Sequence, residues 1–171
     1  INFLSDFFKN VLVIDDWIGR KLLGDNIHIL DWTAMADRSP IHYNQGNLKK
    51  FLGLEYCPIQ REQSFKKNND FLIHLGSNIK TSVYVELIEY ISREYSVKNI
   101  TVIDKKIQEI KNLVHLSKNC NFLDFLNEKE FKKHLLSSKY FISTGGWSCY
   151  QAIASNCLPL LISISHSNTY F

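Results

Sequence analysis

The chain has 171 residues, of which 45% are hydrophobic and 22% charged, proportions typical of a globular protein and unlike those of a disordered or membrane-embedded chain. Its 20 Lys and Arg residues exceed its 17 Asp and Glu residues by three, and no block of like charges indicates nucleic-acid binding. The four cysteines form no CxxC pair, which argues against zinc and against a disulfide framework. With no apolar run of about 18 residues and no signal segment, we expect a cytoplasmic protein without a membrane span.

Apolar runs of strand length alternate with segments of helical periodicity along most of the chain. The first part predicts strands over 10–16, 27–30 and 56–59, with an irregular segment at 33–50 and a polar loop or linker at 60–70. The remainder predicts, in order, strand 71–75, helix 81–95, strand 99–103, helix 105–113, strand 122–123, helix 127–137, strand 140–143, helix 147–155 and strand 160–164. Helix 81–95 carries an apolar stripe of Val85, Ile88, Ile91 and Tyr95.

This alternation predicts the fold class. Strands separated by helices are typical of βαβ units, so we expect an α/β fold with a Rossmann-like parallel sheet flanked by helices. Ligands of such sheets bind beyond the carboxyl ends of the strands. Functional residues are therefore expected directly after the strands, at Asp15 and Asp16, Asp31, Gly76 and Ser77, Asp124, and Gly145 and Gly146.

Two glycine corners lie between a buried strand and a helix, at Gly76-Ser77 and at Gly145-Gly146. Glycine permits a tight turn, and it also lets the backbone approach a phosphate held by the free amides of a helix N-terminus. Both interpretations remain open, because neither GxGxxG nor a P-loop lysine is present. No spacing of Ser, Cys, His and Asp identifies a catalytic triad.

Four stretches carry a resemblance to a known family: Val11–Trp17 (VLVIDDW), Ile29–Tyr43 (ILDWTAMADRSPIHY), Leu52–Glu62 (LGLEYCPIQRE) and Gly145–Asn168 (GGWSCYQAIASNCLPLLISISHSN). In their order and spacing the chain resembles the UDP-sugar hydrolases of pseudaminic acid biosynthesis and the related spore-coat polysaccharide proteins. It is more distantly similar to the nucleotide-binding half of the glycosyltransferases that make lipid II.

The resemblance implies the second half of a GT-B two-domain fold. Residues 1–64 would then be the end of a first domain and an interdomain segment, and residues 65–171 a Rossmann-like domain that binds UDP or a UDP-sugar. The implied substrate-binding residues are Gly76, Ser77, Gly145, Gly146, Ser148, Gln151, Asn168 and Tyr43. The segment 122–126 would border uracil. No metal or organic cofactor is implied, and the family's catalytic histidine would precede Ile1, which leaves the catalytic residue of this chain unknown.

The implied function is the UDP-sugar-binding half of a nucleotide-sugar hydrolase-like protein in surface polysaccharide or nonulosonic (pseudaminic) acid biosynthesis. Four residues depart from the family pattern: Gln151 in place of a ribose-binding acid, Trp147 in place of a small residue, Thr169 and Met35. These departures leave a non-catalytic nucleotide-sugar-binding or interaction module as one alternative. A GT-B glycosyltransferase that uses the same pocket is another.

Overall fold

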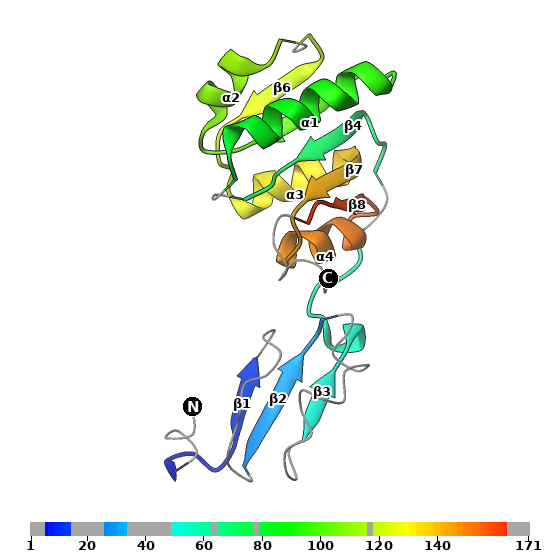
Figure 1. Cartoon of the computed structure of the whole chain (residues 1–171). Coiled ribbons are helices and arrows are strands. Elements are labelled where there is room, and N and C mark those ends of the chain that lie inside the picture. The colour runs from blue at the N-terminus through cyan, green and yellow to red at the C-terminus, as the bar shows by residue number, and fades with distance from the viewer. Residues whose placement is uncertain are drawn as a thin grey trace. The chain divides into compact units, whose positions relative to one another are not determined.

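The computed structural model describes residues 6–14, 26–33, 49–62, 65–76, 79–115 and 118–163. The chain divides into two compact units, one extending to Pro58 and one beginning at Ile59. Both contain parallel sheets, and the predicted α/β fold with a Rossmann-like sheet is confirmed (Figure 1). Within the described ranges, no helix has the length and apolar character that crossing a bilayer requires.

The larger unit contains a five-stranded parallel sheet with the strand order β6-β5-β4-β7-β8. Its elements are β4 (Asn69–Ile73), α1 (Thr81–Glu94), β5 (Ile100–Ile103), α2 (Ile107–Leu113), β6 (Cys120–Leu123), α3 (Glu128–Ser137), β7 (Ser138–Ser143), α4 (Trp147–Ala154) and β8 (Leu158–Leu161). The order runs outward from β4 to β6 on one side and from β7 to β8 on the other. This is the doubly wound pattern, with its switch point between β4 and β7.

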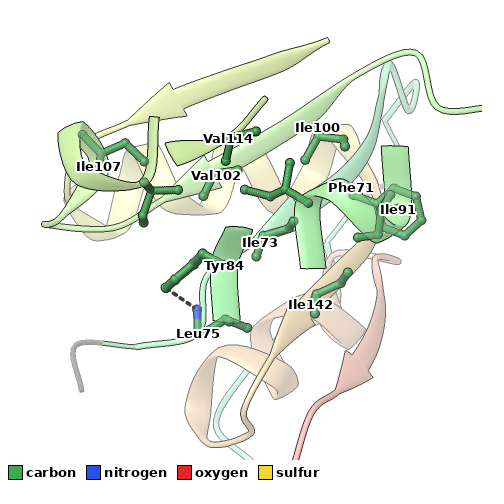
Figure 2. Close-up of a cluster of buried hydrophobic side chains, with 12 residues drawn as sticks. Phe71, Ile73, Leu75, Tyr84, Ile91, Ile100, Val102, Ile107, Val114 and Ile142 are labelled. Carbon is green, nitrogen blue, oxygen red and sulfur yellow. Dashed lines mark hydrogen bonds between the residues drawn. The ribbon is translucent and has the colours of Figure 1, made fainter. Parts of the chain in front are cut away.

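Helices cover both faces of this sheet, α1 and α2 on one face and α3 and α4 on the other (Figure 1). Phe71, Ile73 and Leu75 pack under α1 in a cluster with Tyr84 and Ile91 (Figure 2). Leu72 points to the opposite face and packs with side chains of α3 and α4, including Leu135 and Ala152. Burial on both faces explains why the strands read as continuous apolar runs instead of alternating ones.

The smaller unit contains a second parallel sheet with the order β1-β2-β3, formed by β1 (Val11–Ile14), β2 (Ile27–Asp31) and β3 (Lys50–Leu52). Its buried side chains are Val13, Ile27 and Ile29, with Val11 and Leu52 packed against them. At the end of β2, Asp31 is buried and its Oδ1 accepts a hydrogen bond of 2.9 Å from the Thr33 amide.

The predicted strand at 56–59 is wrong, and β3 takes its place earlier in the chain. Gly53 follows β3 with φ +104° and donates its amide to the Asp31 carbonyl over 2.8 Å. The chain then forms the 3₁₀ helix η3 (Leu54–Tyr56), in which the Tyr56 and Cys57 amides bond back to Gly53 and Leu54. These local bonds use the amides that a strand would need, and Pro58 has none to donate.

The remaining elements differ from expectation mainly at their ends. β4 begins at Asn69, two residues early, because Asn69 pairs in register with Ser138 of β7. β8 runs from Leu158 to Leu161 and includes Pro159. A proline is tolerated in this strand because β8 lies at the edge of the sheet.

One lysine links the ends of two helices. Lys67, just before β4, donates from Nζ to the carbonyls of Leu135 (3.3 Å) and Ser155 (2.9 Å), at the carboxyl ends of α3 and α4. A positive charge is favourable there because helix carboxyl ends carry partial negative charge and unpaired carbonyls. Partial burial lowers the pKa of this amine.

Asp70, at the amino end of β4, is expected to make the stability of the larger unit depend on pH. Its Oδ1 accepts a 2.7 Å hydrogen bond from Lys139 Nζ, and its Oδ2 accepts the amide of Lys98 at 2.7 Å. Lys139 above all, with backbone amides, lowers the pKa of Asp70 below 3.8. The carboxylate therefore stabilises the folded state above its unfolded-state pKa, and that stabilisation is lost as pH falls through the folded-state pKa.

We predict that Asp70→Asn lowers the free energy of unfolding at pH 7 by about 1 to 2 kcal/mol. The difference from wild type should shrink as the pH falls below about 4. Urea unfolding at a series of pH values measures both. Glu94→Gln, in the exposed pair with Arg93, is the control and should have little effect. A difference that stays constant down to acid pH would contradict the assignment.

Candidate functional site

The two glycine corners lie side by side at the switch point of the larger sheet. β4 and β7 are paired in register, Ile73 with Ile142, so their carboxyl ends coincide. The His74 amide then donates to the Ile142 carbonyl over 3.0 Å, and the Thr144 hydroxyl donates to the Leu75 carbonyl over 3.2 Å. Segments 69 residues apart thus lie together at the switch point, which is the position of the ligand-binding crevice in doubly wound sheets.

Both corners have backbone conformations that favour glycine. Gly76 has φ +89°, and Gly146 has φ +83° with ψ −164°, a combination that is almost restricted to glycine. Among the described residues, no heavy atom lies within 4 Å of a Cβ atom built on either glycine. These residues therefore leave space for a bound group to approach the backbone there.

Helix α4 begins directly at the second corner, with Gly146 as its N-cap. Gly146 makes no side-chain cap hydrogen bond, and its carbonyl accepts the Cys149 amide over 3.1 Å. The amino end of the helix carries partial positive charge, which suits an anion. Cys149, in the first turn of α4, is buried. Burial raises the pKa of its thiol, although the Ser143 and Ser148 hydroxyls and the Gly145 amide act to lower it, so the thiol is a neutral group.

Trp147 is partly exposed at the start of α4, with 41% of its surface accessible. Its ring lies at a tilted angle to that of Tyr150, with centroids 6.5 Å apart. Trp147 therefore packs along its own helix beside the corner. Ser148, half-buried, follows it in the first turn of α4.

Gln151 contacts a carboxylate from the neighbouring helix. Its Nε2 lies 3.4 Å from Oε1 of Glu128, the first residue of α3. Gln151 and Ser148 are three residues apart and so share a face of α4. An acid is thus present beside position 151, although the chain itself carries an amide at that position. Nothing in the sequence around Glu128 indicates this, because the contact depends on how α3 and α4 pack.

A buried network behind the first corner was not predicted. Tyr84 of α1 accepts the Leu75 amide over 2.9 Å and donates over 2.8 Å to Oδ2 of Asp104, the residue after β5 (Figure 2 shows the first bond). Oδ1 of Asp104 accepts the Lys106 amide over 2.7 Å. His74 donates from Nδ1 to the Ile103 carbonyl over 3.0 Å and packs edge-on against Phe131.

The apolar stripe of helix 81–95 is partly wrong as predicted: Ile88 and Ile91 are buried, but the third buried residue is Tyr84, while Tyr95 is exposed. Tyr84, Ile88 and Ile91 follow the i, i+4, i+7 spacing. This spacing could have predicted that Tyr84 is buried, and a buried tyrosine hydroxyl needs hydrogen-bond partners.

Three lysines lie at the carboxyl edge of the described sheet, where the acids Asp104, Asp124 and Glu128 also lie. Lys80 occupies the N-cap position of α1, and Lys105 and Lys106 follow β5. All three are exposed. Lys105 Nζ lies 5.3 Å from the ring centre of Phe125, an exposed aromatic side chain after β6. Asp124 precedes it, and its Oδ1 accepts the Phe125 amide over 2.6 Å.

Of the expected substrate-binding residues, the structure places Gly76, Gly145, Gly146, Ser148 and Gln151 in the larger unit, at or near the two corners. Ser77, Asn168 and Tyr43 lie outside the described residues, as do Asp15 and Asp16. Asp31 belongs to the smaller unit. Within the described part of the chain, no three His, Cys, Asp or Glu side chains are grouped in a way that could hold a metal ion.

Comparison of the chain with protein-family models gives no match, and comparison with curated proteins gives none either. The crevice is therefore interpreted from its own geometry and chemistry.

We predict that Gly146→Ala lowers the free energy of unfolding by about 1 to 3 kcal/mol. The cost arises because alanine disfavours the backbone conformation of this residue, not because its Cβ would clash with a described neighbour. Denaturant unfolding measures the loss. Ile153→Ala, at an exposed position of the same helix, is the control and should stay within about 0.5 kcal/mol of wild type. Equal stability of the two variants would contradict the glycine-specific conformation.

Proposed function

We propose that the larger unit binds the diphosphate of UDP or a UDP-sugar at its two glycine corners. In this proposal the chain is the UDP-sugar-binding half of a nucleotide-sugar hydrolase-like protein of surface polysaccharide or nonulosonic acid biosynthesis. The observation that carries the proposal is that Gly76 and Gly146 follow the neighbouring strands β4 and β7 at the switch point, and that no described residue fills the space beside either glycine.

The charge and chemistry of the crevice support a phosphorylated ligand. The amino end of α4 carries the partial positive charge of a helix N-terminus, and Lys80, Lys105 and Lys106 supply cations at the same edge of the sheet, alongside the acids Asp104, Asp124 and Glu128. Glu128 beside Gln151 supplies a carboxylate that sugar hydroxyls can donate to. The choice of uracil over other bases, and of a sugar nucleotide over UDP alone, derives from the family resemblance.

The direct test is calorimetry and thermal shift with UDP, with UMP and ADP alongside. We expect UDP to bind more tightly than UMP, because only UDP places a diphosphate at the corners, and more tightly than ADP if the base is read as well. No heat and no shift at millimolar UDP would contradict the proposal. Tighter binding of ADP than of UDP would retain the diphosphate site and reject uridine.

Position 151 favours a second candidate, a binding module without catalysis. Gln151 is a neutral amide where the resemblance implies an acid, and its Nε2 is directed to Glu128. Such a module would bind UDP-sugar without turning it over. Incubation of the protein with a panel of UDP-sugars, followed by measurement of released UDP, separates the two: release above the uncatalysed rate supports the hydrolase, and binding without release supports the module.

We predict that Gln151→Glu alone does not tighten UDP binding. It would place a second carboxylate where Nε2 now lies 3.4 Å from Oε1 of Glu128, and repulsion would offset a stronger bond to ribose. The double variant Glu128→Gln/Gln151→Glu carries a single acid, at position 151, beside an amide at position 128. It should bind UDP about 3- to 10-fold more tightly than wild type. Calorimetry measures all three proteins. Unchanged affinity in the double variant would show that ribose is not bound at position 151.

A further inference from the structure

Leu75 lies between β4 and Gly76, and side chains hold both polar groups of its backbone. Its amide donates to Tyr84 Oη at 2.9 Å, and its carbonyl accepts the Thr144 hydroxyl at 3.2 Å. Tyr84 Oη in turn donates to Asp104 Oδ2 at 2.8 Å. Three elements therefore converge on one residue: α1 through Tyr84, the β5 end through Asp104, and the β7 corner through Thr144. We call these four residues the Leu75 network.

Side-chain hydrogen bonds hold the backbone at the point where the strand pairing ends. The last backbone bond from this strand to β7 is the one from the His74 amide to the Ile142 carbonyl, so Leu75 follows the strand without a neighbour to continue the pairing. Tyr84 is 1% exposed and Asp104 is 5% exposed, which keeps water from competing for these bonds. Burial raises the pKa of Tyr84, so its hydroxyl remains a donor to the acid.

The burial and bonding of Asp104 argue against a direct role in ligand binding. An acid after the second strand of a doubly wound sheet commonly accepts the ribose hydroxyls of a dinucleotide. β5 is the second strand of this sheet by sequence, but Asp104 is buried, and both of its oxygens are bonded, to Tyr84 and to the Lys106 amide. The acid therefore acts on the protein's own loop.

We propose that Tyr84, Asp104 and Thr144 are positioning residues that fix the Leu75-Gly76 peptide before the ligand arrives. This inference rests on the proposed diphosphate site and adds how that site is preorganised. A loop that is already ordered loses less conformational freedom on binding, so its affinity is higher for the same contacts. The shared residue Leu75 also makes the two glycine corners one unit, because displacement of either corner must break a bond to it.

Tyr84→Phe, Thr144→Val and their double variant test the proposal. Tyr84→Phe retains the aromatic ring and Thr144→Val retains the β-branched shape, while each removes a hydroxyl. Each single variant should weaken UDP binding about tenfold, the equivalent of one hydrogen bond. The double variant should lose less than the product of the two effects, because both act on the same peptide. Thr144→Ser should restore affinity. Tyr90→Phe, exposed on the same helix, is the control and should bind like wild type.

Amide hydrogen exchange without ligand provides an independent measurement. The Leu75 amide, which donates to Tyr84, should exchange at least about tenfold faster in both single variants, while the Val102 amide in the core strand β5 keeps its wild-type rate. Equal exchange rates at Leu75, or UDP affinities within twofold of wild type in folded variants, would overturn the positioning role. If wild type does not bind UDP, the proposed function fails, and the exchange at Leu75 still decides whether the network orders the loop. Should Tyr84→Phe fail to fold, the Thr144 variants carry the same test.

Discussion

Parallel pairing between β4 and β7 governs the larger unit, because every feature of the crevice follows from it. These strands are far apart in the chain, with β5 and β6 and their helices between them. They can be neighbours only if the chain returns past its first strand and continues on the other side. That return places the loop after β4 and the loop after β7 at one edge, with helices leaving from the edge toward opposite faces. The crevice is thus a consequence of strand order.

The sequence was sufficient to predict the fold class and the two corners. Strand runs such as FLI and YFI are apolar on both sides of the pleat, and the helices between them show their own period, so each element is recognisable locally. Gly76 and Gly145-Gly146 were expected at strand-to-helix boundaries, and that is where they lie. Their positive φ values explain why glycine is present at these positions.

What the sequence did not reveal depends on contacts between distant segments. β3 is only three residues long and forms beside β2, a partnership with no local pattern. The bond between Tyr84 and Asp104 and the contact between Gln151 and Glu128 join residues 20 and 23 positions apart. Each residue alone looks ordinary: a helical aromatic, an acid after a strand, a polar helix residue. Their roles emerge only when strand order and helix packing are known.

The hydrogen bonds of Lys67 affect where a fragment containing the larger unit can begin. Its amine bonds the ends of α3 and α4, and the segment just before it also contacts α4 and α3, through the Glu62 amide to the Ala154 carbonyl and the Glu62 carboxylate to Lys132. A fragment that started at the first strand of the larger sheet would leave two helix ends with unpaired carbonyls. A fragment that keeps these bonds must begin upstream, at about Ile59, where the larger compact unit starts. The stretch that follows has the polar composition of a linker.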